Sequence, residues 1–522
     1  MAPIDDEVDI AVIGAGPAGS LLAYLLAEQH GRSVCLIDPG ASKPWPNNYG
    51  VWLEEWDALE NKLHLGLRDC LETEWKYTDC YFGGSWGIPV DKLFRIQRAY
   101  GRVDRAKLRA RLRTPTIRII EDALDTEMVA PNIFTNGALL HDADGSTLTL
   151  ASGRRLRAKI VVDATGSESR LTWRKHRPDW QAVPDPAFQI AYGVECVVDG
   201  NTHYNLEAMT LFDYRTDHFD NDPEWKARAE KIPTFMYAMP LGPAHDGSGG
   251  QRIFFEETSL VARPGVSMEE CKHRCFARLE HLGVKIRPGS ITDEEFCYIP
   301  MGGPTPERGQ RVISFGGAAA IVHPATGYHL CRMMAASSEV AEAIATTWEA
   351  PSGLQPDAVA AAAYDAMWSP SNQAQRDFAL FGAELLMTLD VVGLRGWFDG
   401  FFRLDEGLWA GFLAGWPTLP KNDLHETWQG RLEFGCKMIA RLPPSIAFRL
   451  FQGIFQYTFK YGLPLLRSVF PLPDHHFRHE WEPPTPADLI GDPSAKQEAL
   501  RLASGRPSPH SPATSSAADL AL

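Results

Sequence analysis

The hydrophobic and polar positions near the start of the chain follow the pattern of a β-α-β unit. Residues 9–14 (DIAVIG) form a short apolar run that ends at glycine, which is typical of a buried parallel strand. Residues 20–29 have the apolar density of a helix that packs on a sheet, and residues 33–38 (SVCLID) have the pattern of the next strand. We therefore predict that the chain begins with parallel α/β structure.

Two kinds of strand alternate along the next 300 residues or so. Residues 158–163 (AKIVVD) and 311–316 (RVISFG) resemble the first buried strand, and each is followed by a glycine-containing turn. Between them, residues 188–198 and 251–256 have the pattern of an antiparallel sheet. Because the two kinds are interleaved, we expect one domain to be inserted into another.

The pattern becomes helical from residue 334 onward. Between residues 432 and 470, Phe, Ile and Leu alternate with Lys and Arg, as in helices that lie in a membrane interface. A pair of core helices is the alternative, and the pattern alone does not decide between them. Residues 484–522 are rich in Pro, Ser and Ala, so we expect a disordered tail there.

Charge and cysteine content narrow the possible partners. The net charge of -15 over 522 residues argues against nucleic acid, which requires a basic surface. The nine cysteines are scattered, and only Cys271 and Cys275 are close. With no second pair to complete a zinc site, we expect reduced thiols and no metal.

No segment of the sequence has the pattern of a membrane span. Apolar runs stay shorter than the roughly 18 residues that a spanning helix needs. The first strand begins almost at once, which leaves no room for a signal or transit peptide. We expect a peripheral protein of a plastid or a cyanobacterial or other bacterial membrane.

The first glycine-rich turn predicts dinucleotide binding. Gly14 permits the tight turn, Gly16 lets the backbone approach a pyrophosphate, and Gly19 lets the helix pack closely. Asp38 ends the second strand, at the spacing where a carboxylate accepts hydrogen bonds from the adenosine ribose.

Two later strand ends favour FAD over NAD. Asp163 to Gly166 (DATG) resembles the second fingerprint of two-dinucleotide-fold flavoproteins, and Gly316-Gly317 resembles their third flavin-contact region. In redox members of that superfamily an Asp follows the glycine, and here Gly317 takes its place. We therefore expect the flavin to be held or used differently.

These observations predict a domain organisation. Residues 1–333 form an α/β, FAD-binding, Rossmann-like domain of the two-dinucleotide-fold type. An antiparallel-sheet substrate domain, approximately residues 185–300, is interleaved with it. A helical C-terminal region, residues 334–483, contacts the membrane and precedes the tail.

Five longer motifs then resemble plant, algal and cyanobacterial lycopene β- and ε-cyclases. They are NNYGVW at residues 47–52, YGRVD at 100–104, FFEET at 254–258, IPMGG at 299–303 and VHPATGY at 322–328. The resemblance extends over about residues 8–415, and the chain beyond Leu413 matches poorly.

The resemblance implies a cyclisation without net redox change. A carboxylic acid protonates the terminal double bond of a lycopene ψ end group, the next alkene attacks the cation, and loss of a proton closes an ionone ring. Reduced FAD, generated with NAD(P)H, is required in this family. Its electron-rich ring would stabilise a nearby carbocation.

Glu256 and Glu257 match the acidic pair of the family motif. An acid that protonates an alkene must stay neutral until it reacts, and an apolar pocket raises its pKa. Phe254 and Phe255 flank the pair. On a strand the two carboxyls point to opposite faces, and we favour Glu256 as the acid.

Further residues are candidates for supporting roles. Asp213 matches a family motif and is either a second acid or proton acceptor, or a turn aspartate paired with Arg215. His323 and Tyr328 could shape the cavity near the isoalloxazine. Aromatic residues that could stabilise a cation, or simply fill the core, are Trp45, Tyr49 and Trp52.

Alternatives remain at the level of reaction and product. The motifs mix β-cyclase and ε-cyclase features, and the sequence does not fix the ring type, the number of rings or the oligomeric state. A neoxanthin or capsanthin synthase would use the same acid on an epoxide. A flavin monooxygenase or other oxidoreductase of a lipophilic substrate is the rival from another class.

Overall fold

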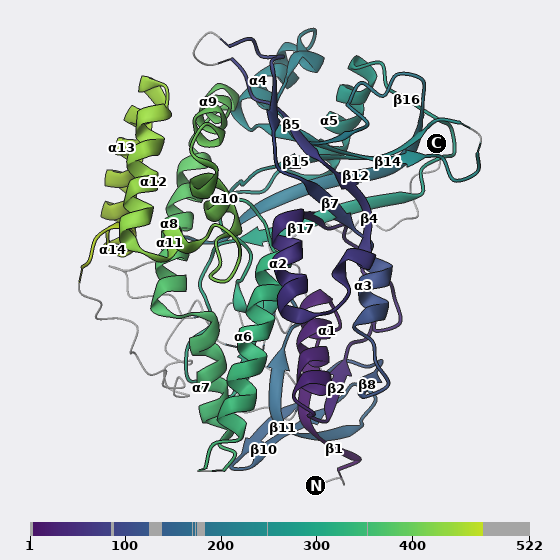
Figure 1. Cartoon of the computed structure of the whole chain (residues 1–522), viewed down its shortest axis with the longest axis vertical. Helices are drawn as coiled ribbons and strands as arrows, with labels where there is room; N and C mark the ends of the chain where they lie inside the picture. The colour runs from purple at the N-terminus through teal and green to yellow at the C-terminus, as the bar shows by residue number, and fades with distance from the viewer. Residues whose placement is uncertain are drawn as a thin grey trace.

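Two large sheets and a set of C-terminal helices build the described part of the chain, as the computed structural model in Figure 1 shows. The described residues are 4–84, 88–124, 138–169, 171–172, 174, 183–247, 249–351 and 353–472. In Figure 1 the parallel sheet occupies the lower half, and the antiparallel sheet lies above it. The predicted tail, residues 484–522, lies outside the described residues.

The first sheet is mostly parallel and has the order β8-β2-β1-β11-β10-β9, with β18 also paired to β11. Its strands are β1 Asp6–Ile13, β2 Val34–Ile37, β8 Ile117–Ile120, β9 Leu139–Asp142, β10 Gly145–Thr149, β11 Arg155–Asp163 and β18 Val312–Ser314. The C-terminal half of β1, residues 10–13, is apolar and buried because both faces of the sheet are covered. Helices α1 (Pro17–Tyr24) and α6 (Leu330–Trp348) pack against each other on this sheet. The predicted parallel unit is confirmed.

The register of this sheet brings three strand ends to one level. Ile13 of β1 lies beside Asp163 of β11, which in turn lies beside Ser314 of β18. The turns that follow these strands therefore meet at one edge, where ligands bind in open α/β sheets.

The second sheet has the order β16-β12-β15-β14-β13-β5-β6, with β17 paired to β12. Its strands are β5 Tyr77–Tyr81, β6 Leu93–Ile96, β12 Ala187–Asp199, β13 Ala208–Asp213, β14 Thr234–Pro243, β15 Gln251–Ser259, β16 Lys285–Ile286 and β17 Asp293–Met301. Only the pairing of β13 with β5 is parallel. Six strands fall in the range 185–300, whereas β5 and β6 join from an earlier part of the chain.

A small third sheet and short helices connect the two halves. Its strands are β3 Gly50–Trp52, β4 Leu71–Trp75 and β7 Tyr100–Val103. Besides α1, the α-helices before the C-terminal region in the described residues are α2 Leu53–Leu63, α3 Arg105–Arg111, α4 Pro223–Lys231 and α5 Met268–His281. Helix α5 packs on β12 and β15 and covers one face of the antiparallel sheet (Figure 1).

The C-terminal region is helical, as predicted. Its remaining helices are α7 Pro356–Met367, α8 Pro370–Leu386, α9 Val391–Phe402, α10 Glu406–Ala414, α11 Asp423–Glu426, α12 Trp428–Arg441, α13 Pro444–Tyr461 and α14 Pro464–Val469. Among the residues that the structure describes, no helix has the length and apolar character to cross a membrane. Within the same residues, no three His, Cys, Asp or Glu side chains cluster as metal ligands do.

Candidate active site

The first glycine-rich turn joins β1 to α1, and its glycines occupy different environments. Gly14 has a φ of 106°, and a Cβ atom there would lie 2.3 Å from the Ala164 carbonyl oxygen. A Cβ atom on Gly19 would lie 1.9 Å from the Gly14 carbonyl oxygen, so α1 packs directly on the turn. At Gly16 the same position has no atom within 4 Å. The backbone is therefore open at the helix N-terminus, where N–H groups attract phosphate.

Asp38 links the end of β2 to this turn through hydrogen bonds. Its carboxylate accepts hydrogen bonds from the backbone N–H of Ala15 at 2.8 Å and of Gly40 at 2.6 Å. The side chain stays half-buried, and a carboxylate has room for further hydrogen bonds. Asp38 thus has the position and the spare acceptors to bind ribose hydroxyls.

The turns of the second and third fingerprints lie next to the turn of the first. Asp163 is buried and accepts hydrogen bonds from the N–H and hydroxyl of Thr165, which order the turn that leads to Gly166. A Cβ atom on Gly317 would lie 3.2 Å from the Gly166 Cα, and one on Gly316 would lie 2.6 Å from the Ala18 Cβ. A longer side chain at Gly317 would therefore crowd the Gly166 turn.

Glu256 and Glu257 lie next to each other in β15 and point to opposite faces of the antiparallel sheet. The Glu257 face is covered by α5, whose Arg278 bonds to Glu257. The Glu256 face is turned toward the dinucleotide-binding half, since Gln189 of β12, on that face, meets Gly327 from the loop after β18. Only Glu256 therefore faces the side where a bound flavin would lie.

Glu257 belongs to a buried network of ion pairs. Its oxygens accept hydrogen bonds from Arg278 at 2.8 and 2.9 Å and from the Thr234 hydroxyl at 2.5 Å. The side chain has no exposed surface. Glu257 is thus one half of a buried ion pair on the face that α5 covers.

Asp213 lies in the same network. Burial alone would raise its pKa, but hydrogen bonds from Arg215 and the charge of Arg278 outweigh burial and lower the pKa to about 2. The Tyr204 hydroxyl also donates to Asp213 at 2.9 Å. The structure therefore shows the paired aspartate that the sequence left as one of two alternatives.

Glu256 has the opposite environment. It lies between Gly193 of β12 and Tyr237 of β14, deep in the protein, yet its side chain keeps accessible surface. Burial, together with the negative charge of Glu295, raises the pKa of Glu256 to about 8. The carboxyl is therefore neutral at pH 7 and can donate a proton to a molecule that reaches it.

Aromatic side chains line the same region. The Tyr237 hydroxyl donates to the Tyr100 hydroxyl at 3.0 Å, and Trp52 meets Tyr100 edge-on with ring centroids 4.9 Å apart. Burial and the neighbouring Tyr100 raise the pKa of Tyr328, so this phenol is neutral as well. Such rings offer π faces to a developing positive charge without supplying a base.

The remaining predicted pocket residues divide between this region and others. Tyr49 follows Asn48, which bonds to Glu295, and burial and the charge of Glu295 raise the pKa of Tyr49. Phe255 packs on the Glu257 face with Cys271 and Cys275, so the structure does not bring it to Glu256. His323 is buried against Phe412, with ring centroids 5.2 Å apart.

A comparison with protein families identifies the chain at this point. The model of a family described as "Lycopene cyclase protein" matches residues 9–426. The chain belongs to the lycopene cyclase family. The resemblance seen in the sequence motifs is thereby confirmed.

Curated relatives in this family carry more than one activity in their names. The chain is 39% identical over 416 residues to a chloroplastic lycopene beta cyclase of Arabidopsis thaliana, covering 79% of this chain and 76% of the relative. It is 36% identical over 408 residues to a chloroplastic neoxanthin synthase of Solanum lycopersicum, covering 78% and 74%.

The fold of this lycopene cyclase family member is that of a Rossmann-like flavoprotein. A solved flavin-dependent brominase matches with a TM-score of 0.52 and 16% identity, over 82% of this chain and 98% of that chain. At this identity the match shows the fold alone. The predicted fold class is confirmed.

Several residues of this site were not singled out from the sequence. Glu295 and Tyr237 reach the region from β17 and β14, and Asn48 bonds to Glu295. Asn48 stands in one of the family motifs, which was a usable signal. For Glu295 the signal is absent, since sequence alone does not show that β17 pairs with β12.

Proposed function

We propose that the protein is an FAD-dependent lycopene cyclase that converts linear ψ end groups into ionone rings of the β or ε type. One observation carries this proposal: Glu256 is a reachable carboxyl whose pKa is raised to about 8, on the face turned toward the dinucleotide-binding half. Alkene protonation needs such an acid, and redox chemistry by the flavin alone does not.

FAD fits the three fingerprints. The open backbone at Gly16 and the α1 N-terminus would take the pyrophosphate, Asp38 the ribose, and the turns at Asp163, Gly166, Gly316 and Gly317 the remainder of the cofactor. Reduced by NAD(P)H, bound FAD would supply an electron-rich ring near the developing positive charge.

The chain's own residues would carry the proton chemistry. The Glu256 carboxyl gives its proton to the terminal double bond, whose π electrons form the new C–H bond. The adjacent alkene attacks the resulting cation, and a carbon of the new ring gives a proton back to the Glu256 carboxylate or to water, so that the product has the atoms of the substrate and the acid is restored. Trp52, Tyr100 and Tyr237 would shelter the cation from water and face it with π electrons.

Glu257 and Asp213 would support this reaction from behind the sheet. Asp213 is paired with Arg215, and Glu257 with Arg278 of α5. They would therefore hold β15 and β13 in place, while Glu256 acts as the acid.

The test is turnover of lycopene by the purified protein with FAD and NADPH. The proposal predicts a cyclic product of unchanged mass, and pigment analysis then gives the ring type. A product with one added oxygen would indicate a monooxygenase. Conversion of an epoxy-carotenoid, with lycopene left linear, would indicate the neoxanthin or capsanthin synthase reaction, which the name of one relative makes a specific alternative.

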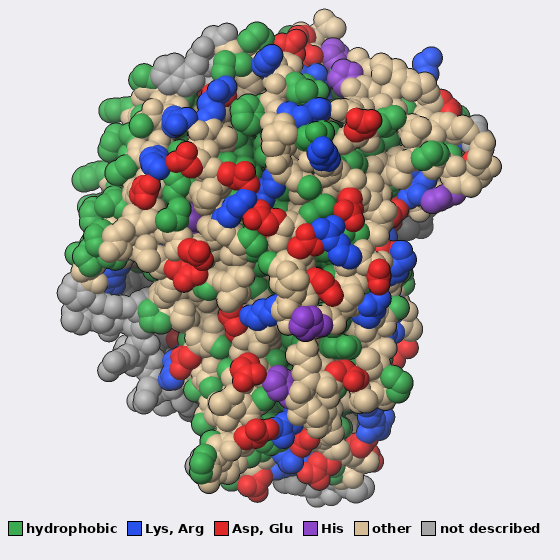
Figure 2. Space-filling model, in the orientation of Figure 1, with side chains coloured by type: hydrophobic (Ala, Val, Ile, Leu, Met, Phe, Trp, Pro, Cys, Tyr) green, Lys and Arg blue, Asp and Glu red, His purple; other side chains and the backbone are tan. Residues whose placement is uncertain are grey.

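We also propose that α13 rests on a membrane surface. Four phenylalanines on one side of the helix are largely exposed: Phe448 at 70%, Phe451 at 56%, Phe455 at 74% and Phe459 at 87%. Figure 2 shows hydrophobic side chains gathered along the flank that α13 forms in Figure 1. Large apolar patches of this kind mark interaction sites on otherwise polar proteins.

A lipid bilayer is the occupant that fits this face. The exposed cations Arg449 and Lys460 lie on the same helix, as expected where headgroups are anionic. A lycopene substrate would itself dissolve in the bilayer. Attachment through α13 corresponds to a peripheral protein of a plastid or bacterial membrane.

Vesicle binding tests the membrane proposal. Phe459→Ser should weaken binding to anionic vesicles by about tenfold or more, because burying a phenylalanine contributes roughly 1.5–3 kcal/mol. Phe296→Ser, which changes a 48%-exposed phenylalanine on β17, is the matched control and should bind as the unmodified protein does. Equal binding of both variants would contradict the proposal.

A further inference from the structure

A second carboxyl, Glu295, lies close to Glu256 across the antiparallel sheet. Gly193 of β12 pairs with Glu256 on one side and with Glu295 of β17 on the other. The two glutamates therefore flank a residue without a side chain, on the same face and about 10 Å apart between backbones. A Cβ atom on Gly193 would lie 2.4 Å from the Phe254 ring, so an apolar ring and no polar side chain occupies the space over this glycine.

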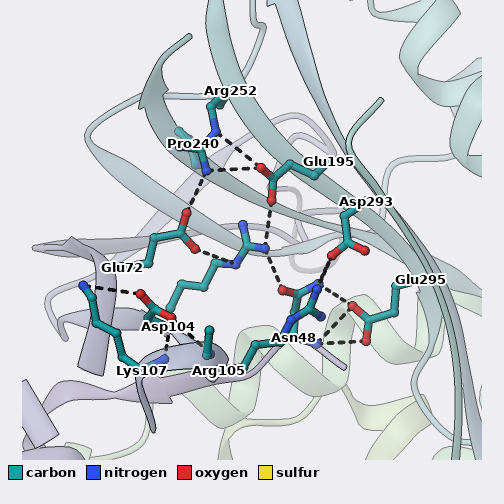
Figure 3. A network of polar contacts seen from close by, with 12 residues as sticks. Asn48, Glu72, Asp104, Arg105, Lys107, Glu195, Pro240, Arg252, Asp293 and Glu295 are labelled. Atoms are coloured by element: carbon teal, nitrogen blue, oxygen red, sulfur yellow. Dashed lines mark hydrogen bonds and ion pairs between the residues drawn. The ribbon is translucent and has the colours of Figure 1, made fainter. Parts of the chain in front are cut away.

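Hydrogen-bond donors converge on Glu295. The backbone N–H of Asn48 lies 3.1 Å from both of its oxygens, and the Asn48 side-chain amide donates to one of them at 2.5 Å. The Cys297 thiol donates at 2.7 Å. Figure 3 shows Asn48 and Glu295 pointing toward one another within a larger polar network. Donors arranged in this way stabilise a carboxylate anion.

The network also fixes the orientation of Asn48. Arg102 donates to the Asn48 side-chain oxygen at 2.6 Å, which leaves the amide N–H₂ to face Glu295. Arg105, paired with Asp293 at 2.8 Å, adds positive charge nearby. On balance burial raises the pKa of Glu295, although the donors from Cys297 and Asn48 and the charge of Arg105 lower it; at Glu256 no such donor among the described residues opposes burial.

Glu256 has no such support. Among the residues that the structure describes, no hydrogen-bond donor reaches its carboxyl, and its β14 neighbour Tyr237 donates to Tyr100 instead. One proton shared between these two carboxyls is therefore expected on Glu256, since the surroundings favour the anion at Glu295.

We propose that Glu295 is a positioning residue that stays ionised and thereby keeps Glu256 protonated for the reaction. This inference rests on the proposed function, in which Glu256 is the acid. It gives a role to Asn48, the second asparagine of the NNYGVW motif, whose N–H groups stabilise the negative charge on Glu295.

The other titratable groups near the pair do not compete for this role. Burial raises the pKa values of Tyr49, Tyr237 and Cys297, which keeps all three neutral near pH 8. Arg102 is paired with Glu195 at 2.9 Å, and Arg105 with Asp293. A change in the proton affinity of Glu256 can thus be attributed to Glu295.

The test is the pH dependence of kcat/KM for lycopene, measured on the FAD-loaded full-length protein with NADPH. Glu295→Gln removes the charge, so the alkaline limb of the profile should move to lower pH by about one unit. Glu295→Asp keeps the charge and should restore most of the original profile. The control is Glu294→Gln, a neighbouring and exposed residue on the other face, which should leave the profile unchanged.

Infrared absorption of protonated carboxyls gives a second readout that does not depend on the folding of Glu295→Gln. At neutral pH the difference spectrum between the parent protein and Glu256→Gln should contain a protonated carboxyl band, which separates Glu256 from other buried carboxyls such as Glu55. If the difference spectrum lacks this band, the proton is not on Glu256 and the inference is wrong. An unmoved alkaline limb in Glu295→Gln, with Glu256→Gln inactive, would also overturn the inference but leave the proposed function standing. Cyclisation by Glu256→Gln would instead refute the proposed function.

Discussion

The two faces of the antiparallel sheet give the neighbouring residues Glu256 and Glu257 opposite environments. Glu257 lies beneath α5, fully buried, and forms an ion pair with Arg278 and a hydrogen bond with Thr234. Glu256 faces the dinucleotide-binding half, has Glu295 as a neighbour, and its pKa is raised to about 8. Two adjacent positions on one strand therefore hold a carboxylate in a buried ion pair and a carboxyl with a raised pKa. The charge around each carboxyl, and not burial alone, therefore decides its role.

The largest expected effect comes from removing the acid. Glu256→Gln should lower the rate of lycopene cyclisation by roughly 10²–10⁴-fold, because proton donation in the transition state is lost. Product formation by the purified, FAD-loaded variant measures this. The unfolding free energy should change by no more than about 1 kcal/mol, since a neutral amide replaces a neutral carboxyl.

The matching change on the other face, Glu257→Gln, should mainly lower the stability of the fold. Glu257→Gln leaves the buried Arg278 without its full partner, which should cost about 3–5 kcal/mol of unfolding free energy. Urea unfolding of both variants checks the contrast. If Glu257→Gln were as stable as the parent and equally impaired in cyclisation as Glu256→Gln, the division of roles between the faces would be wrong.

The pH dependence sharpens the contrast without any mutation. In the proposed mechanism the protonated form of Glu256 is the active one, so kcat/KM should fall as pH rises through about 8. Above that value the fall should approach about tenfold per pH unit. The low pKa of Asp213, about 2, means that Asp213 does not titrate in this range. A profile that instead fell through an ordinary glutamate pKa would exclude Glu256 as the acid.

The smallest predicted effect concerns the tyrosines beside Glu256. Tyr237→Phe removes the 3.0 Å hydrogen bond to Tyr100 but keeps the ring, so unfolding free energy should drop by only about 0.5–1.5 kcal/mol. Cyclisation should change far less than in Glu256→Gln. A loss of activity as large as that of Glu256→Gln would give the Tyr237 hydroxyl a direct part in proton transfer.

Local signals explain why much of the fold was predictable. The apolar run of β1, the glycines after it and Asp38 lie close together in sequence, and the structure places them in one turn. The pairing of β5 with β13 was not predictable, because residues near 77 and 208 meet only in the tertiary fold. The sequence range proposed for the substrate domain therefore lacked β5 and β6.

The same reasoning applies to the candidate site. Period-2 alternation predicted that Glu256 and Glu257 point apart, and the structure agrees. The partners that distinguish them, Arg278 on α5 and Glu295 on β17, come from other elements. The placement of Phe255 with α5 follows from the same alternation, since it shares the face of Glu257.

Titration of Glu256 in the FAD-loaded protein shows whether its carboxyl is neutral at pH 7. The signal of the protonated carboxyl, assigned by its loss in Glu256→Gln, should persist at pH 7 and disappear with a midpoint near pH 8. A midpoint near 4.5, the ordinary value for glutamate, would show that Glu256 is ionised at neutral pH and would contradict the account.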